Sequence, residues 1–189
     1  GTIFTAEIVI ADFKNCLVKI TSETVQEKRD YHLHIAIAPT KMNDRMEWFL
    51  EKATEIGIDE ITPVICDKSE RKVIKKERFE KIIQSAMKQS LQAYLPILNE
   101  AMSFKQFLNL EHQETKYIAH CEETEKHLLS DEVKNKKSVL ILIGPEGDFS
   151  LEEIKLAIDN NFRPVSLGET RLRTETAGVV AAHTMSLMS

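Results

Sequence analysis

The stretch SVLILI-GPEGDF-SLEE, residues 138–153, decides the fold. Residues 138–143 are almost wholly apolar, which is typical of a strand buried on both faces of a parallel sheet. Residues 144–149 predict a loop, because they hold two glycines and a proline. Ser150 with Glu153 three residues later forms a capping-box pattern, which predicts a helix over about 151–160. A buried strand, a loop and a helix in this order indicate an α/β domain with a mainly parallel sheet.

The alternation of strands and helices continues on both sides of this stretch. Apolar periodicity predicts further strands over 31–38, 61–66, 116–121 and 163–167. It predicts further helices over about 42–56, 75–92 and 104–110, and a final helix that Thr174 can cap. In that final helix Ala177–Ala182 leave almost no polar position, so we expect it to be buried all round, within the subunit or across a two-fold axis.

Residues 2–22 carry a different pattern from the rest of the chain. β-rich runs over 3–10 and 16–20 flank the turn-forming residues 12–15, which predicts a β-hairpin. An isolated hairpin is only marginally stable in water, so we expect it to pack on something else or to be the remainder of a larger module. The polar residues 22–30 are interpreted as a linker.

The composition of the 189-residue chain excludes several classes of protein. No apolar run approaches the ~20 residues of a membrane-spanning helix, and we see no secretory signal. Three cysteines without a C-x-x-C pair favour a reducing cytoplasm over a disulfide framework. Neither the pair His32 and His34 nor the group His120, Cys121 and His127 completes a ligand set, so we expect no metal.

Ligands of open parallel sheets bind beyond the carboxyl ends of the strands. The loops that follow Cys121, Ile143 and Leu167 are therefore candidate binding loops, and the last two are expected to follow adjacent strands. Their glycines allow a ligand to approach the backbone, although ordinary tight turns explain them about equally well. The chain has no P-loop and no dinucleotide fingerprint. Because Glu146 and Asp148 make the second loop acidic, we expect a neutral or cationic ligand rather than a phosphate.

Several blocks of residues resemble the signatures of one family. The two main blocks are LIGPEGDFSLEE at 142–153 and SLGETRLRTETA at 166–177. Further matches are KATEIG at 52–57, Pro63, Ser69, Ala86, Gln89, Ser90 and Pro96. Over about 31–189 the chain resembles the RsmE family of 16S ribosomal RNA uridine-N3 methyltransferases, which belong to the SPOUT superfamily. It departs from the family at Asp148, where a second glycine is common, and at Leu91-Gln92, where an arginine often follows.

The resemblance implies a fold, a cofactor and an assembly. Residues 31–189 would form a SPOUT-type, mainly parallel sheet with a C-terminal trefoil knot. Residues 1–30 would be the remnant β-hairpin of a PUA-like barrel with a linker. The implied assembly is a homodimer, and the implied cofactor is S-adenosylmethionine. The implied cofactor-binding residues are Ala119, His120, Ile143, Gly144, Gly147, Leu167, Gly168, Leu172, Arg173 and Thr174.

Residues 68–88 form a basic segment in an otherwise acidic chain. They hold eight Lys or Arg against three Glu, whereas the net charge of the chain is −5. RNA binding needs such cations to replace phosphate counterions, but a solvated helix face is an equally simple explanation. The candidate RNA-binding residues are Lys68, Arg71, Lys72, Lys75, Lys76 and Arg78. The implied partner is 16S ribosomal RNA or the small ribosomal subunit.

The chemistry of uridine methylation indicates which residues act. The N3–H of uridine is a weak acid, so attack on a methyl sulfonium needs a base or a cation that stabilises the uracil anion. Arg171 and Arg173 can supply the cation, and Glu175 can accept the proton, orient an arginine or only place charge in the first turn of the last helix. The predicted activity is S-adenosylmethionine-dependent methylation of uridine N3 in 16S ribosomal RNA. Two alternatives stay open: a non-catalytic RNA-binding or ribosome-assembly module, and another α/β enzyme with a nucleotide cofactor.

Overall fold

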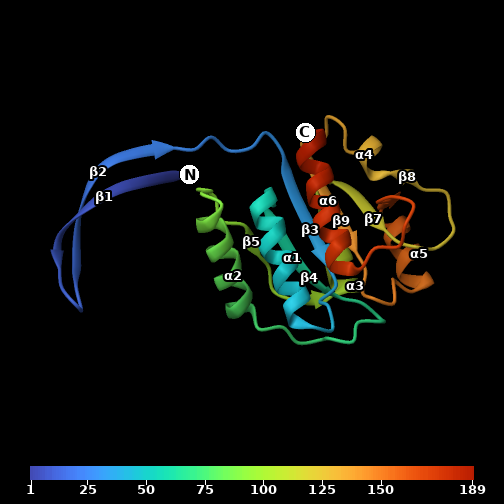
Figure 1. Cartoon of the computed structure of the whole chain (residues 1–189). Helices are drawn as coiled ribbons and strands as arrows, with labels where there is room; N and C mark the ends of the chain where they lie inside the picture. Colours follow the sequence, from blue (N-terminus) through green and yellow to red (C-terminus); the bar gives the residue numbers. More distant parts are fainter.

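The computed structural model describes residues 1–189 and contains one parallel sheet and one separate antiparallel hairpin (Figure 1). The strand order in the sheet is β5-β4-β3-β9-β7-β10-β8, with β6 beside β4, and every pairing is parallel. The sheet strands are β3 (His32–Ile37), β4 (Glu60–Ile65), β5 (Ile97–Leu98), β6 (Met102–Ser103), β7 (Thr115–Ala119), β8 (His127–Leu128), β9 (Ser138–Ile143) and β10 (Arg163–Ser166).

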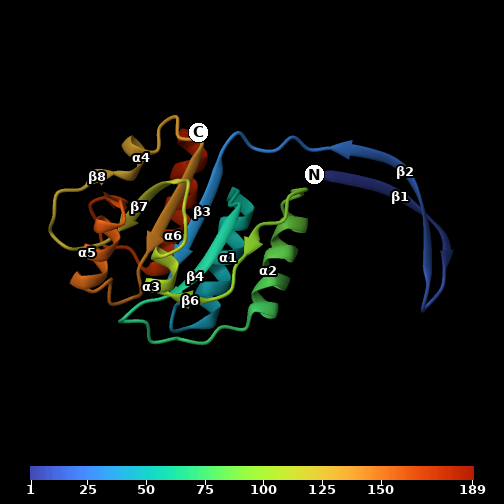
Figure 2. The same cartoon turned by 180° about the vertical axis from the view of Figure 1, so that it is seen from behind.

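Helices cover both faces of the sheet (Figures 1 and 2). They are α1 (Asn43–Ile56), α2 (Lys76–Gln89), α3 (Phe104–Leu108), α4 (Leu129–Glu132), α5 (Leu151–Asp159) and α6 (Thr174–Met188). Side chains of α1, α2, α4 and α6 join the larger core cluster, and those of α3 and α5 join the smaller one. None of these helices combines the length and the apolar character that crossing a bilayer requires.

The central strand β9 confirms the prediction that its sequence made. Val139, Ile141 and Ile143 enter the larger core, whereas Leu140 and Leu142 enter the smaller one. All five side chains are at most 2% exposed. The uninterrupted apolar run is therefore the consequence of burial on both faces of the strand.

Most element boundaries agree with the sequence, and the exceptions have local causes. The capping box of α5 is present, with Ser150 N–H donating to Glu153 Oε2 at 2.9 Å. The helix α2 ends at Gln89 rather than at residue 92, because Leu91 has a φ of 55° and leaves the helical region. The short elements β5, β6, β8 and α4 were not predicted, since two to four residues carry no measurable periodicity.

Two expectations about the functional end of the sheet are wrong. The strands β9 and β10 are not adjacent, because β7 lies between them. Thr174 does not cap α6 but is its first residue, and no side chain caps that helix. The Thr174 hydroxyl instead donates to the carbonyl of Gly144 at 3.0 Å, because the loop after β9 lies against the beginning of α6.

Within this chain the final helix α6 is buried on one side only. Gly178, Ala181 and Met185 are buried, whereas Leu187 is 63% exposed. The buried side packs against α1 and β3. A Cβ atom at Gly178 would lie 2.5 Å from Phe49 Cε2, which is too close for any side chain. Glycine therefore permits the close approach of α6 to its neighbours.

The hairpin of β1 (Thr2–Ala11) and β2 (Cys16–Val25) forms as predicted and extends away from the sheet (Figures 1 and 2). Asp12 Oδ1 accepts the backbone N–H of Lys14 and so stabilises the turn. Every residue of both strands is exposed. The chain that follows the hairpin is anchored to the domain through Gln26, whose carbonyl accepts from Tyr94 Oη at 3.1 Å.

Replacing Gly178 with alanine is expected to destabilise the protein. The Phe49 ring that the new methyl group would meet is fully buried and has no space to move into. Overpacking of this kind lowers the free energy of unfolding by about 1–3 kcal/mol. The better helix propensity of alanine offsets at most about 1 kcal/mol of this loss. Chemical denaturation should therefore give a lower free energy of unfolding for Gly178→Ala than for the native protein.

The matched control is Gly147→Ala. There the nearest atom to a new Cβ is Cδ of Lys68, 3.3 Å away on a flexible side chain. This variant should unfold at nearly the native denaturant concentration. Equal stability of Gly178→Ala and the native protein would contradict the assigned packing of α6 on α1.

Candidate functional site

Three loops start level with one another at the carboxyl edge of the sheet. Ala119 at the end of β7 pairs with Ile143 at the end of β9 and with Val165 in β10. The loop after β7 therefore lies between the two glycine-containing loops. This arrangement confirms that the strand ends bring the three candidate loops together, with β7 in the middle.

Two adjoining cavities occupy this edge, with volumes of about 340 Å³ and 270 Å³. The first lies between the loop after β7 and residues 165–172. The second extends to the loop after β9 and the beginning of α6. Both are lined by Ala119, Cys121, Arg171, Leu172 and Ala177.

Nine of the ten residues expected to bind a cofactor line these cavities. Those on the first cavity are Ala119, His120, Leu167, Gly168 and Leu172. Those on the second are Ala119, Ile143, Gly144, Leu172, Arg173 and Thr174. The tenth, Gly147, lines neither cavity, and its carbonyl instead accepts from Lys68 Nζ at 3.0 Å.

The glycines of the two loops serve different purposes. Gly168 has a φ of +141°, which L side chains rarely adopt, and the space beside it is open. Gly144 has no such constraint, but a Cβ there would lie 3.0 Å from the Phe149 ring. Gly144 therefore allows the loop after β9 to close over Phe149, and the ring rather than a ligand occupies the space that a side chain would need.

Asp148 connects the loop after β9 to the loop after β7. Its Oδ2 accepts the N–H of Cys121 at 2.7 Å, and its Oδ1 accepts the N–H of Phe149 at 2.8 Å. Its φ of 62° lies in the left-handed region that Asp and Asn tolerate better than most residues. This backbone conformation explains how Asp148 replaces a glycine, and the carboxylate adds a contact that glycine cannot make.

His120 is a buried polar residue without a partner. It lines the first cavity and is 7% exposed, yet neither Nδ1 nor Nε2 has a hydrogen-bond partner. Burial lowers the pKa of the His120 imidazole below its ordinary value, and nearby Lys126 lowers this pKa further. The neutral ring offers one donor and one acceptor to a ligand in the cavity.

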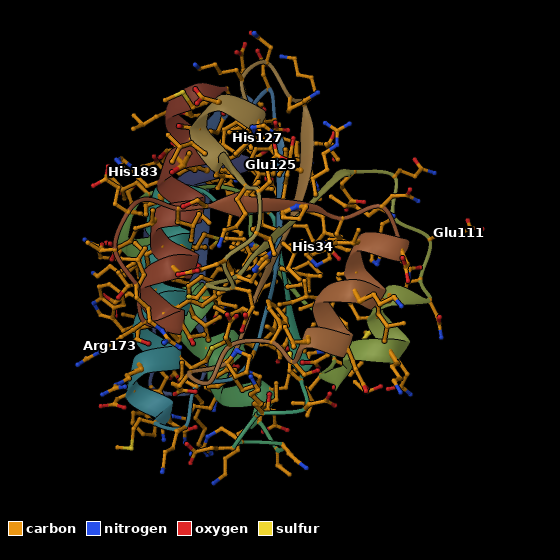
Figure 3. The ribbon with its side chains drawn as sticks, turned by 90° about the vertical axis from the view of Figure 1, so that its right-hand side faces the viewer. His34, Glu111, Glu125, His127, Arg173 and His183 are labelled. Carbon is orange, nitrogen blue, oxygen red and sulfur yellow. The ribbon has the colours of Figure 1, made fainter.

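The three candidate catalytic residues do not lie together. Arg171 lines both cavities and Arg173 the second, and both side chains are exposed without an ion pair. Figure 3 shows Arg173 projecting outward at the beginning of α6. Glu175 lines neither cavity and is buried, with Oε1 3.8 Å from Nε of Arg45 and no partner on Oε2. No sequence pattern singles out Arg45, which lies on α1 and approaches Glu175 in the folded chain.

The residues that sequence reasoning missed come mainly from the loop after β7. Cys121 and Lys126 line the first cavity, and Lys126 Nζ donates to the carbonyl of His120 at 3.0 Å. That loop has no glycine to mark it. Ala177 in the first turns of α6 also lines both cavities, and only its place in the block 166–177 could have singled it out.

Four of the six candidate RNA-binding residues have partners within the protein. Lys68 donates to the carbonyls of Gly147 and Phe149, and Arg71 to those of Thr40 and Lys41. Lys76 pairs with Glu100 at 2.6 Å, and Arg78 with Glu47 at 2.6 Å. Lys72 and Lys75 are exposed and form no ion pair, so they are the cations most available to a polyanion.

Comparison with known proteins establishes the family. Residues 26–186 match the family model described as an RNA methyltransferase domain. The chain belongs to this family. Ribosomal RNA small subunit methyltransferase E of Buchnera aphidicola subsp. Acyrthosiphon pisum is 32% identical over 98% of this chain and 76% of its own length.

Solved structures of family members share the fold. A protein of Porphyromonas gingivalis described as a probable rRNA-methyltransferase is 44% identical, with a TM-score of 0.91 over 99% of this chain and 82% of its own. Ribosomal RNA small subunit methyltransferase E of Neisseria gonorrhoeae, bound to S-adenosyl methionine, is 25% identical, with a TM-score of 0.86 over 99% of this chain and 79% of its own. The resemblance to the RsmE family is thereby confirmed.

Proposed function

We propose that this chain transfers a methyl group from S-adenosylmethionine to N3 of a uridine in 16S ribosomal RNA. Family membership and relatives named ribosomal RNA small subunit methyltransferase E support the reaction class and the RNA. The pair of cavities at the ends of β7, β9 and β10 carries the proposal, because nine of the ten expected cofactor residues line it. A non-catalytic RNA-binding module and a different nucleotide enzyme are not favoured, since a relative is solved with S-adenosyl methionine.

The chemistry of the lining fits this cofactor. Both unpartnered nitrogens of His120 are buried at the first cavity, where the polar edge of an adenine or a ribose would satisfy one of them. Apolar side chains of Leu167, Leu172 and Ala177 offer a surface for the rest of the base. The carboxylates of Glu146 and Asp148 line the second cavity and favour a cation over a phosphate.

The cofactor supplies an electrophilic methyl group on a sulfonium sulfur when it is bound. Uracil loses its N3 proton as the methyl group is transferred, so a negative charge develops on the ring. Arg171 and Arg173 lie exposed at the mouth of the cavities, where their guanidinium groups stabilise this charge. Glu175 is buried beside Arg45 and outside both cavities, which supports a role in orienting an arginine rather than in accepting the proton.

The finer architecture is part of the same proposal. Residues 31–189 are a SPOUT domain with a C-terminal trefoil knot, and the Thr174–Gly144 hydrogen bond supports this by placing the segment before α6 against the loop after β9. Residues 1–30 are a separate unit, a hairpin of a PUA-like barrel with a linker. Support for this division comes from the exposed strands of the hairpin, whose Phe4, Ile8 and Phe13 are each more than half exposed.

The protein acts as a homodimer in this proposal, with α6 at the interface. Within one chain this helix leaves Leu187 63% exposed and Val179 and Val180 half-buried. An interface about a two-fold axis would place the same surface of two copies together and cover these side chains. Burial within one chain does not explain why Ala177–Ala182 include no polar residue. Burial in the dimer accounts for it.

A leucine at position 177 tests the cofactor site. Ala177 lines both cavities from α6, where leucine is also a good helix former, so Ala177→Leu fills the cavities without breaking the helix. Calorimetry should show that S-adenosylmethionine binds to this variant at least tenfold more weakly than to the native protein. Transfer of labelled methyl groups to 16S ribosomal RNA should fall in parallel.

Thr184→Leu is the control for that change, since Thr184 lies later in α6 and lines neither cavity. It should bind the cofactor as the native protein does. Native affinity in a folded Ala177→Leu variant would place the cofactor elsewhere. Absence of binding to the native protein would reject the proposed activity itself.

Charge reversal of Lys72 and Lys75 tests the RNA surface. Each lost phosphate contact lowers the slope of log affinity against log salt by about 0.7–0.9. Lys72→Glu/Lys75→Glu should therefore weaken 16S ribosomal RNA binding, reduce this slope by about 1.4–1.8, and leave cofactor binding unchanged. The control Lys105→Glu/Lys155→Glu makes the same charge change on α3 and α5, and equal effects of the two pairs would show that only net charge matters.

A charged residue at position 187 tests the dimer. Leu187 is 63% exposed in the single chain, so Leu187→Arg should not affect its folding but should separate two copies that meet at α6. Sedimentation should give a dimer for the native chain and a monomer for this variant. Ile158→Arg, an exposed apolar position on α5, should remain dimeric. A single native species near 21.6 kDa would reject the dimer.

A further inference from the structure

A second cluster of chemistry-bearing side chains lies at the amino edge of the sheet, opposite the cavities. It consists of His34 on β3 and of His112 and Glu114 in the segment that leads into β7. One ring nitrogen from each histidine and one carboxylate oxygen lie within 4.8 Å of one another. None of the three residues lines the two cavities at the carboxyl edge. Figure 3 shows the labelled His34 toward the middle of the molecule, away from Arg173.

Each imidazole is held by its Nε2 atom from outside the cluster. Nε2 of His112 lies 2.9 Å from the carbonyl of Phe107, which can only accept, so this nitrogen carries the proton. Nδ1 of His112 is then the ring atom with a free lone pair. A second histidine nitrogen bonded to a backbone carbonyl is the usual arrangement around a bound metal, because it fixes the tautomer and the ring orientation.

His34 is also bonded through its Nε2, but to a hydroxyl that can donate or accept, so this bond does not fix the tautomer. Its Nε2 lies 2.8 Å from the Thr62 hydroxyl, and that hydroxyl accepts from Nδ2 of Asn99 at 2.7 Å. Its Nδ1 faces Oε1 of Glu114 at 3.6 Å. The outer hydrogen bonds therefore leave Nδ1 of His34 directed toward the other members of the cluster.

One aromatic ring packs against both imidazoles of the cluster. The Phe107 ring meets His34 edge-on at 5.8 Å between centroids and lies 4.6 Å from the His112 ring. His34 is 3% exposed, and the Glu114 side chain is 14% exposed. Low exposure strengthens the attraction between a cation and its ligands.

We propose that His34, His112 and Glu114 form a site for a divalent transition metal such as Zn²⁺. Two imidazoles and one carboxylate are a common protein ligand set for Zn²⁺, and a water would complete a tetrahedron. Magnesium and calcium take oxygen ligands almost exclusively and do not fit this set. The metal would join β3 to the beginning of β7, two strands that are separated in the sheet by β9.

The sequence alone did not reveal this site, and it led us to expect no metal. The sequence pattern pairs His34 with His32, whose Nε2 lies 3.8 Å from Oε2 of Glu60 and which is not a member of the cluster. The other two ligands, His112 and Glu114, come from a distant part of the chain. Both lie in the segment just before β7. Only the parallel sheet brings this segment level with His34.

Metal titration of the full chain tests the site. Protein freed of metal with a chelator should bind one equivalent of ZnCl₂ in calorimetry, and Co²⁺ should give the absorption of a tetrahedral complex. His112→Gln and Glu114→Gln should each weaken Zn²⁺ binding at least tenfold. Both residues are only half-buried, so these variants keep the buried His34 and its fold, which circular dichroism checks.

His127→Gln and His183→Gln are the controls, because both histidines are exposed and lie outside the cluster. They should bind Zn²⁺ with native affinity. Zinc should also raise the melting temperature of the native protein and of both controls but not of the cluster variants. Absence of binding to the native protein, native affinity in both cluster variants, or loss of binding in either control would overturn the site and leave the cluster as a buried His–Glu pair.

Discussion

The burial of β9 on both faces is the constraint on which the rest of the structure depends. A strand with helices on each side has no face for polar residues, so residues 138–143 must be apolar throughout. Its neighbours β3 and β7 run parallel to it, and every strand therefore ends at one common edge. That edge carries the three loops and both cavities. The opposite edge holds the beginnings of the strands and, with them, the cluster of His34, His112 and Glu114.

The sequence predicted those features of the fold that depend on residues close together along the chain. The apolar run of β9 and the capping box at Ser150 and Glu153 are local patterns, and the structure contains both. The family signatures also located most of the cavity lining. The position of β7 between β9 and β10 was not predictable in this way, because sheet order depends on contacts between distant segments.

The roles of individual side chains were also not predictable from neighbours along the chain alone. The sequence marks Gly144 as a glycine of a candidate binding loop. Only the folded loop shows that the Phe149 ring is what leaves no room for a side chain at this position. Thr174 looks like a helix cap, yet its hydroxyl donates to a carbonyl thirty residues away in the chain. Lys68 and Arg71 look like part of a free basic surface, whereas both donate to backbone carbonyls of other loops. In each case a contact that forms only in the folded chain decides the role of a residue whose type is compatible with several roles.

The contacts of Lys68 and Arg71 also join the basic segment to two other loops of the protein. Lys68 binds the carbonyls of Gly147 and Phe149 in the loop after β9, and Arg71 binds those of Thr40 and Lys41 after β3. The same loop after β9 lines the second cavity. The basic segment is therefore joined by hydrogen bonds to a loop that lines the second cavity. If binding at one of these two places changes the affinity at the other, thermodynamic reciprocity requires both affinities to change by the same factor.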